Sequence, residues 1–266
     1  MSLILIKILC SVVLVLLLVY ISELNPRLGG LISGLPTGTG VVIYFYSLER
    51  GNDFILSGIP YAMLGLLCSL CWSLGFYFGG KLWPQHRWLN FGIGVLLSIS
   101  CYVGLGFFVK NLAPNLYLNF LLFVIAALVV NIIYRRIPVS NFKPKSSGTK
   151  WLKILFRMLM VSSIVLLITH FAKLLGAEWA GIMASFPTVL FPVLMILKYE
   201  HQDKVYPTVI KNYALGLFTI PIFYFSLWFG LAALGVNLAF LVAYTLCFGY
   251  VWLVYFVQQK MAKSTK

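Results

Sequence analysis

Long unbroken apolar runs limit the fold of this chain more than any other feature. The segment LCSVVLVLLLVYI, residues 9–21, contains no charged side chain. A helix satisfies its own backbone hydrogen bonds in lipid, and about 20 apolar residues let it cross the hydrocarbon core. A membrane β-barrel would instead show short strands in which apolar and polar residues alternate. The runs are solidly apolar, so we predict an all-α integral membrane protein.

The scarcity of charge leads to the same prediction. Charged residues are 10% of the 266 residues, whereas a soluble domain carries roughly 25% because its surface faces water. The longest polar stretch, Arg135–Lys150, is too short to be a soluble domain. We predict about nine transmembrane helices: Leu3–Ile21, Gly29–Ser47, Phe54–Gly79, Trp88–Val109, Leu116–Tyr134, Trp151–Leu174, Trp179–Leu197, Val205–Phe229 and Leu231–Val257.

Basic residues predict the orientation of these spans. The formal net charge is +14, and the Lys and Arg residues lie in short loops, as in the cytoplasmic loops of membrane proteins. They form no basic stripe with exposed aromatics, so we expect no nucleic-acid partner. With nine spans, three basic loops and the C-terminal tail lie on the same side of the membrane. The loops are Lys81–Arg87, Arg135–Lys150 and Lys198–Lys204. We expect a bacterial inner-membrane protein with a cytoplasmic C-terminus and a periplasmic N-terminus, although Lys7 fits this less well.

The chain resembles itself when it is shifted by 151 residues. Ten identities occur without a gap between positions 30 and 79. An aligned Pro-Thr pair and an aligned Glu are poorly explained by shared hydrophobicity, so we predict an internal repeat. The identities match Gly30 with Gly181, Pro36 with Pro187, Thr37 with Thr188, Val42 with Val193, Glu49 with Glu200, residues 64–66 with 215–217, and residues 78–79 with 229–230.

The span count predicts that the two copies are inverted. Residues 1–110 form the first four-helix repeat and residues 151–266 the second, joined by a linking helix and basic loop at residues 111–150. An odd number of spans separates equivalent helices, which reverses the second copy, as in many secondary transporters. An even span count would favour the alternative, a parallel duplication without a transport role.

The repeated Pro-Thr segments carry the predicted site. Proline inside a helix removes a hydrogen bond, and freed backbone groups in the membrane cost several kcal/mol unless protein or water satisfies them. A matched pair of interrupted spans points to a transporter binding site, and helix N-termini favour an anion. The alternative is a kinked structural helix. The predicted substrate-binding residues are Ser33, Pro36, Thr37, Thr39, Ser185, Pro187 and Thr188.

Four further polar residues are candidates for gating or coupling. Glu49 and Glu200 close the two Pro-Thr spans, and only six Asp and Glu residues occur in the chain. Each glutamate is alternatively a helix-end charge among lipid headgroups. Lys211 and Asn212 lie inside an apolar span, where ionisable groups are candidates for function. Lys211 is alternatively a side chain that extends to the cytoplasmic interface.

Residues for catalysis or metal binding are too few to name a reaction. Cys68 and Cys71 form a CxxC motif, but no second pair or nearby histidine supports a metal site. His170 at a helix end is more typical of a structural residue. We expect no enzyme activity, no cofactor and no metal.

The segment LGGLISGLPTGTGVVIYFYSLERG resembles the small GlpM-type bacterial membrane proteins. Their small-residue helix with a Pro-Thr pair, followed by an acidic residue and Arg-Gly, matches Gly30, Pro36, Thr37, Glu49, Arg50 and Gly51. The second copy departs from this pattern, with His201 and Gln202 after Glu200. The resemblance implies a fused pair of such units and brings no defined activity.

We therefore expect a secondary transporter for a small polar, anionic solute, which works by alternating access in the lipid bilayer and is compatible with a homodimer. The prolines and threonines would line a midplane site, and the glutamates would gate it or couple it to protons. The second hypothesis is a non-transport helper subunit or a lipid-handling scaffold, for which the Pro-Thr spans would be continuous helices that face lipid.

Overall fold

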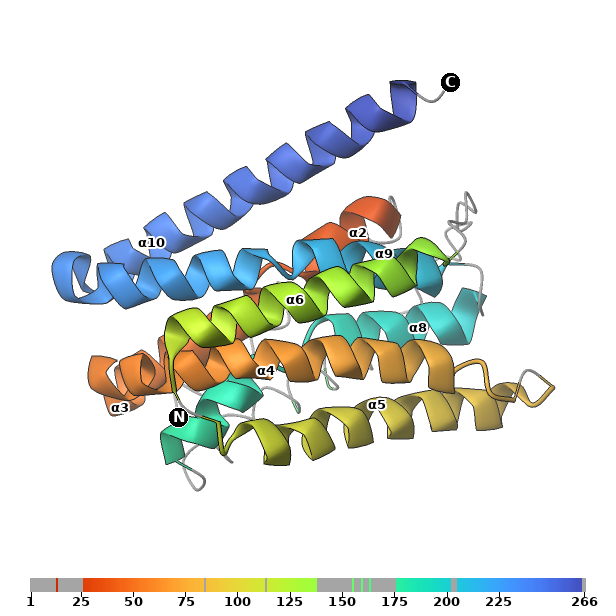
Figure 1. Cartoon of the computed structure of the whole chain (residues 1–266), viewed down its shortest axis with the longest axis horizontal. Helices are drawn as coiled ribbons and strands as arrows, with labels where there is room; N and C mark the ends of the chain where they lie inside the picture. The colour runs from red at the N-terminus through yellow and green to blue at the C-terminus, as the bar shows by residue number, and fades with distance from the viewer. Residues whose placement is uncertain are drawn as a thin grey trace.

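The computed structural model describes residues 26–83, 85–112, 114–137, 176–201 and 205–264, with four isolated residues (Figure 1). All regular structure in these ranges is helical. The predicted spans Leu3–Ile21 and Trp151–Leu174 lie outside the ranges. The helices are α2 (Pro26–Ser33), α3 (Thr37–Arg50), α4 (Asn52–Gly79), α5 (Arg87–Val109), α6 (Leu116–Arg135), a helix at residues 176–184, α8 (Leu190–His201), α9 (Tyr206–Gly216) and α10 (Thr219–Ser264).

Several helices are long and apolar enough to cross a membrane. They include α4, α5 and α6, together with Leu28–Arg50, which joins α2 and α3. The span Tyr206–Lys260 has 55 residues and turns back on itself at Gly235, whose φ is 69°. A φ in this region strains any side chain with a Cβ, so a glycine stands there. The predicted boundary at residues 229–231 was therefore about five residues early.

The helices run along one axis in alternating directions (Figure 1). The chain passes from right to left through α2 and α3, and from left to right through α4. It passes from left to right again through residues 176–184 and α8, opposite to α2 and α3. We call the right-hand end in Figure 1 the basic end, because it carries the described cations Lys81, Arg87, Arg135, Arg136, Lys198 and Lys260.

Burial divides the helices into a central and an outer set. In an 18-residue stretch of each span, 78% of the residues are buried in Leu28–Arg50 and 67% in α4, whereas 28% are buried in each of α5 and α6. The outer helices expose large apolar side chains such as Leu96, Phe108 and Leu121. A soluble monomer rarely exposes so continuous an apolar surface. Lipid is the solvent that suits it, and the fold is that of a membrane-embedded helical bundle.

Glycines allow the central helices to touch through their backbones. A Cβ on Gly216 of α9 would collide with the backbone of Leu31 in α2. A Cβ on Gly65 of α4 would likewise lie 2.6 Å from the carbonyl oxygen of Ile182. Small residues at such contacts let membrane helices pack closely. Close packing stabilises the bundle there, because the hydrophobic effect does not drive helices together in lipid.

Candidate functional site

The first Pro-Thr span is interrupted at its middle. Helix α2 ends at Ser33, and α3 begins at Thr37 with Pro36 in front of it. No side-chain cap satisfies the first amides of α3. Four backbone hydrogen bonds close the break: Gly34 N to Leu31 O (3.1 Å), Leu35 N to Ile32 O (2.9 Å), Thr37 N to Leu35 O (2.7 Å) and Gly40 N to Pro36 O (2.6 Å).

The second Pro-Thr span has the same local structure. Every donor and acceptor of its break lies 151 residues after its counterpart in the first break. The predicted single span Trp179–Leu197 is therefore two helices, residues 176–184 and α8. Its hydrogen bonds are Ser185 N to Ile182 O (3.1 Å), Phe186 N to Met183 O (3.0 Å), Thr188 N to Phe186 O (2.7 Å) and Phe191 N to Pro187 O (2.9 Å).

Side chains from distant helices satisfy the freed carbonyl groups of the first break. The Thr219 hydroxyl donates to Gly34 O at 2.6 Å, and the Tyr244 hydroxyl donates to Pro36 O at 3.0 Å. Of the local hydroxyls, Ser33 donates away from the break to Gly29 O at 2.6 Å, and Thr37 donates to Leu35 O at 3.5 Å. The sequence analysis did not identify Thr219 and Tyr244 as hydrogen-bond donors, because a single Thr or Tyr in an apolar run gives no sequence signal.

The second break is satisfied in the same manner. The Tyr102 hydroxyl donates to Ile182 O at 2.6 Å, and the Ser69 hydroxyl donates to Ser185 O. Ser185 itself donates to Ala62 O at 2.6 Å and lies 2.6 Å from the Tyr224 hydroxyl. Ser185 therefore ties the break to α4 and α10.

The starts of α3 and α8 lie against each other. A Cβ on Gly38, the second residue of α3, would overlap the Thr188 hydroxyl oxygen. Thr39 and Thr188 are both buried. The first amides of a helix have no partners inside it and carry partial positive charge. Among the predicted binding residues, Thr188 makes this contact between the two helix starts, and Thr37, Thr39 and Pro187 are neighbours in sequence of its two partners.

The predicted gating residues do not join this contact. Half-buried Glu49 lies at the end of α3, and the backbone of Glu200 lies near the end of α8 at the basic end. The ammonium group of Lys211 donates to Ile137 O at 3.1 Å, just beyond the end of α6. Asn212 donates to Thr208 O at 2.8 Å within α9. The four residues lie toward the ends of the bundle, and their roles stay predictions.

Lys198 is a buried cation that the sequence analysis treated only as a loop residue. Its ammonium group donates to Gly80 O at 2.6 Å and lies 4.8 Å from the ring centroid of Tyr206. Arg87 donates to Tyr199 O nearby. These contacts join the end of α8 to the connection between α4 and α5 at the basic end.

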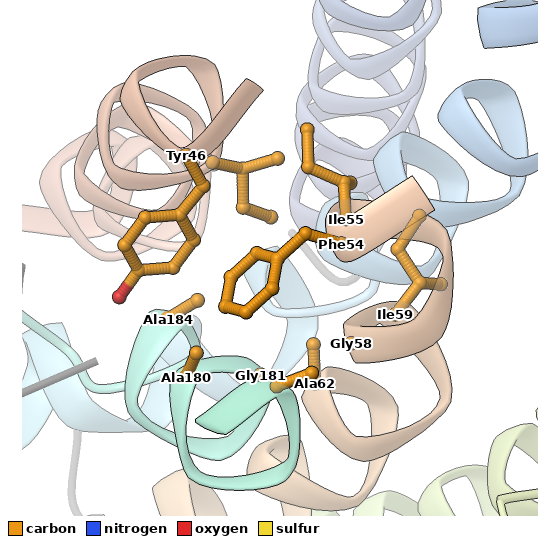
Figure 2. Close-up of a pocket in the computed structure, with 11 residues that line it drawn as sticks. Tyr46, Phe54, Ile55, Gly58, Ile59, Ala62, Ala180, Gly181 and Ala184 are labelled. Atoms are coloured by element: carbon orange, nitrogen blue, oxygen red, sulfur yellow. The ribbon is translucent and has the colours of Figure 1, made fainter. Parts of the chain in front are cut away.

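A small apolar pocket lies between α3, the start of α4 and residues 177–184 (Figure 2). The rings of Tyr46 and Phe54 face the small side chains of Ala180 and Ala184 there. The buried Tyr46 hydroxyl has no hydrogen-bond partner among the described atoms. The pocket reaches Ala184, the residue before Ser185, and thus approaches the second break.

Neither a metal site nor a known relative gives the function of this site. The described residues contain no cluster of three His, Cys, Asp or Glu side chains that could hold a metal. The Cys68 thiol lies 3.9 Å from the carbonyl oxygen of Leu64 in its own helix. Comparisons of the chain with protein-family models, curated proteins and solved structures give no match.

Proposed function

We propose that this protein is a secondary transporter for a small anionic solute, with its site where the starts of α3 and α8 meet. The observation that carries this proposal is the contact of Gly38 with Thr188 at two breaks of identical hydrogen-bond pattern. The two Pro-Thr spans run in opposite directions, and the N-termini of α3 and α8 meet near the middle of the bundle. Such half-helix ends favour negative charge and recur in secondary transporters.

Reciprocal packing supports an inverted repeat. Gly65 packs on Ile182, and 151 residues away from each partner, Gly216 packs on Leu31. Each repeat thus contacts the other through the same surface, which is the signature of a two-fold relation. Because the equivalent spans run in opposite directions, that axis lies across the helices, in the plane of the membrane.

The two ends of the bundle differ in a way that suits alternating access. Gly58 and Ala62 line the apolar pocket, whereas the buried Val209 and Tyr213 stand at the equivalent positions of the second copy. The basic end is therefore filled, and Lys198 holds it closed. We assign the basic end to the cytoplasm of a bacterial inner membrane by the excess of Lys and Arg. The structure then corresponds to a state closed on the cytoplasmic side.

The alternative of a helper subunit or lipid scaffold receives less support. It requires the two Pro-Thr spans to be continuous helices that face lipid. Both spans are interrupted, and 78% of the residues in an 18-residue stretch of the first are buried.

Flux into proteoliposomes tests the proposal. The full chain is reconstituted, and uptake of chloride, nitrate, formate, acetate, phosphate and sulfate is measured with and without a proton gradient. We expect saturable uptake of at least one anion. Thr37→Val with Thr188→Val should lower it about tenfold or more, since a hydrogen bond to a charged group contributes about 1.5–3 kcal/mol.

Thr245→Val is the matched control, because Thr245 is exposed and bonds only to Leu241 O of its own helix. Thermal stability in detergent shows whether each variant is folded. Uptake no faster than in empty vesicles for every anion would refute the transporter. Uptake that the double variant leaves unchanged would refute the site.

A further inference from the structure

Lys198 is a buried cation near the end of α8. Its side chain is 6% exposed, and its ammonium group donates to Gly80 O at 2.6 Å and to the Tyr206 hydroxyl at 3.5 Å. The ring centroids of Tyr206 and Phe76 lie 4.8 Å and 6.0 Å from the ammonium nitrogen. A buried charge is costly in a membrane protein, so an ionisable group at such a place is a candidate for function.

A second contact ties the next residue of α8 to the other end of the same connection. Arg87, the first residue of α5, donates to Tyr199 O, and its guanidinium group lies 5.1 Å from the centroid of the Tyr199 ring. The rings of Trp88 and Tyr199 lie 5.5 Å apart, centroid to centroid. Lys198 and Tyr199 thus fasten α8 to both ends of the connection between α4 and α5.

Helix α8 is separated from the first half of its span by the second break. Residues 185–189 lie between the helix at residues 176–184 and the start of α8 at Leu190. Hinges in proteins are a few residues between rigid elements, and the break is such a place. The contacts of Lys198 and Tyr199 lie at the end of α8 that is far from the break, where a rotation of the helix would move it most.

The equivalent end of the first copy carries different side chains. At positions 151 residues away, Lys198 and Tyr199 correspond to Ser47 and Leu48, and Gly80 and Arg87 correspond to Leu231 and Leu238. The Ser47 hydroxyl donates to Asn52 Oδ1 at 3.1 Å, just after its own helix, and Leu48 is 53% exposed. The repeated fold therefore has cationic groups at one of two equivalent places and uncharged side chains at the other.

Helix α3 contacts the hairpin of the other copy through an uncharged pair. The Tyr44 hydroxyl donates to Asn237 Oδ1 at 3.1 Å, close to the turn at Gly235, and this hydrogen bond is exposed. A hydrogen bond from a charged donor is stronger than one between neutral groups. The side chains at the two ends therefore favour a bundle that is closed at the basic end.

We propose that the contact of Lys198 with Gly80 is a latch. The basic end opens when the end of α8 moves away from the connection between α4 and α5, and the ammonium group must leave Gly80 O for this to happen. An interaction made in only one of two states shifts their populations by its own free energy. This inference rests on the proposed function, because it names the residue that regulates access to the same site.

Thiol reactivity of the purified full chain in detergent tests the latch. Val209 is 0% exposed and lies against Gly30 at the basic end, so Val209→Cys in a variant without the native cysteines reports opening there. Lys198→Met keeps a long side chain and removes its charge. We expect it to raise the rate at which a small thiosulfonate reagent labels position 209 by about tenfold, in line with the loss of a hydrogen bond from a charged group.

Two controls separate the latch from a general loss of stability. Lys260→Met makes the same chemical change at an exposed lysine of the basic end and should leave the rate unchanged. Ala127→Cys lies in α6, is 0% exposed and reports global unfolding, so its labelling should not respond to Lys198→Met. Unchanged labelling of position 209 in Lys198→Met, or an equal rise at position 127, would overturn the proposal.

Gly80→Ala is the second variant if Lys198→Met does not fold. Its Cβ would overlap the ammonium group of Lys198, so the group is displaced while its charge remains. We expect faster labelling of position 209 here as well. Gly92→Ala is the control, because a Cβ at position 92 meets no atom within 4 Å. Equal labelling rates in the two alanine variants would refute the latch.

The latch and the transporter fail separately. Faster labelling of position 209 in Lys198→Met, without anion flux in vesicles, would leave the latch standing and refute the transporter. Anion flux together with unchanged labelling of position 209 would support the transporter and refute the latch.

Discussion

Thr188 places its hydroxyl against Gly38, so that two helices from opposite halves of the chain begin side by side. Any side chain larger than hydrogen at position 38 would displace Thr188. The contact depends on two breaks with the same backbone hydrogen bonds, and these breaks depend on donors from other helices. The following predictions address this dependence, the packing around it and the orientation of the bundle.

Tyr102→Phe should destabilise the protein by about 0.5–1.5 kcal/mol, the usual net contribution of one hydrogen bond. The change removes the side-chain donor to Ile182 O at the second break, which then keeps only the Ser185 amide. Thermal or denaturant unfolding in detergent measures the effect. Tyr117→Phe is the control, since Tyr117 is 63% exposed and should change stability little. Equal stability of the two variants would show that the tyrosine does not support the break.

Gly216→Ala should destabilise the protein by about 1–3 kcal/mol, because overpacking forces helices apart. Its Cβ would collide with the backbone of Leu31, which has no side-chain freedom to move away. Gly104→Ala on α5 has open space around it and should be neutral or slightly stabilising, since Ala favours helix. Unfolding temperature and the yield of monodisperse protein report the difference. A neutral Gly216→Ala would contradict the close approach of α2 and α9.

Cysteine labelling tests the orientation. In a variant without the native cysteines, Lys110→Cys and Lys81→Cys place thiols at opposite ends of the bundle. An impermeant thiol reagent applied to intact cells should label position 110 and not position 81, because the proposed orientation places the basic end in the cytoplasm. Permeabilised cells should show labelling at both positions. Labelling of position 81 in intact cells would reverse the assignment, and labelling of both would contradict the topology.

Local patterns predicted the helices well and their partners poorly. The spans at α4, α5 and α6 could be predicted because a helix in lipid needs only its own sequence to satisfy its backbone. The position of both interruptions could also be predicted, since Pro36 and Pro187 lack an amide hydrogen. The turn at Gly235 was misplaced, because an apolar run continues through it and one glycine does not distinguish a turn from a helix contact.

The sequence by itself determined a helical membrane chain, two matched Pro-Thr interruptions and a set of basic loops. These features follow from the chemistry of single residues and short segments. Only the tertiary structure decided that Tyr102, Ser69, Thr219 and Tyr244 satisfy the breaks, that Thr188 meets Gly38, and that Lys198 reaches Gly80. The physical reason is that a hydrogen bond or a backbone contact between distant helices depends on how those helices pack, and no local pattern encodes that packing.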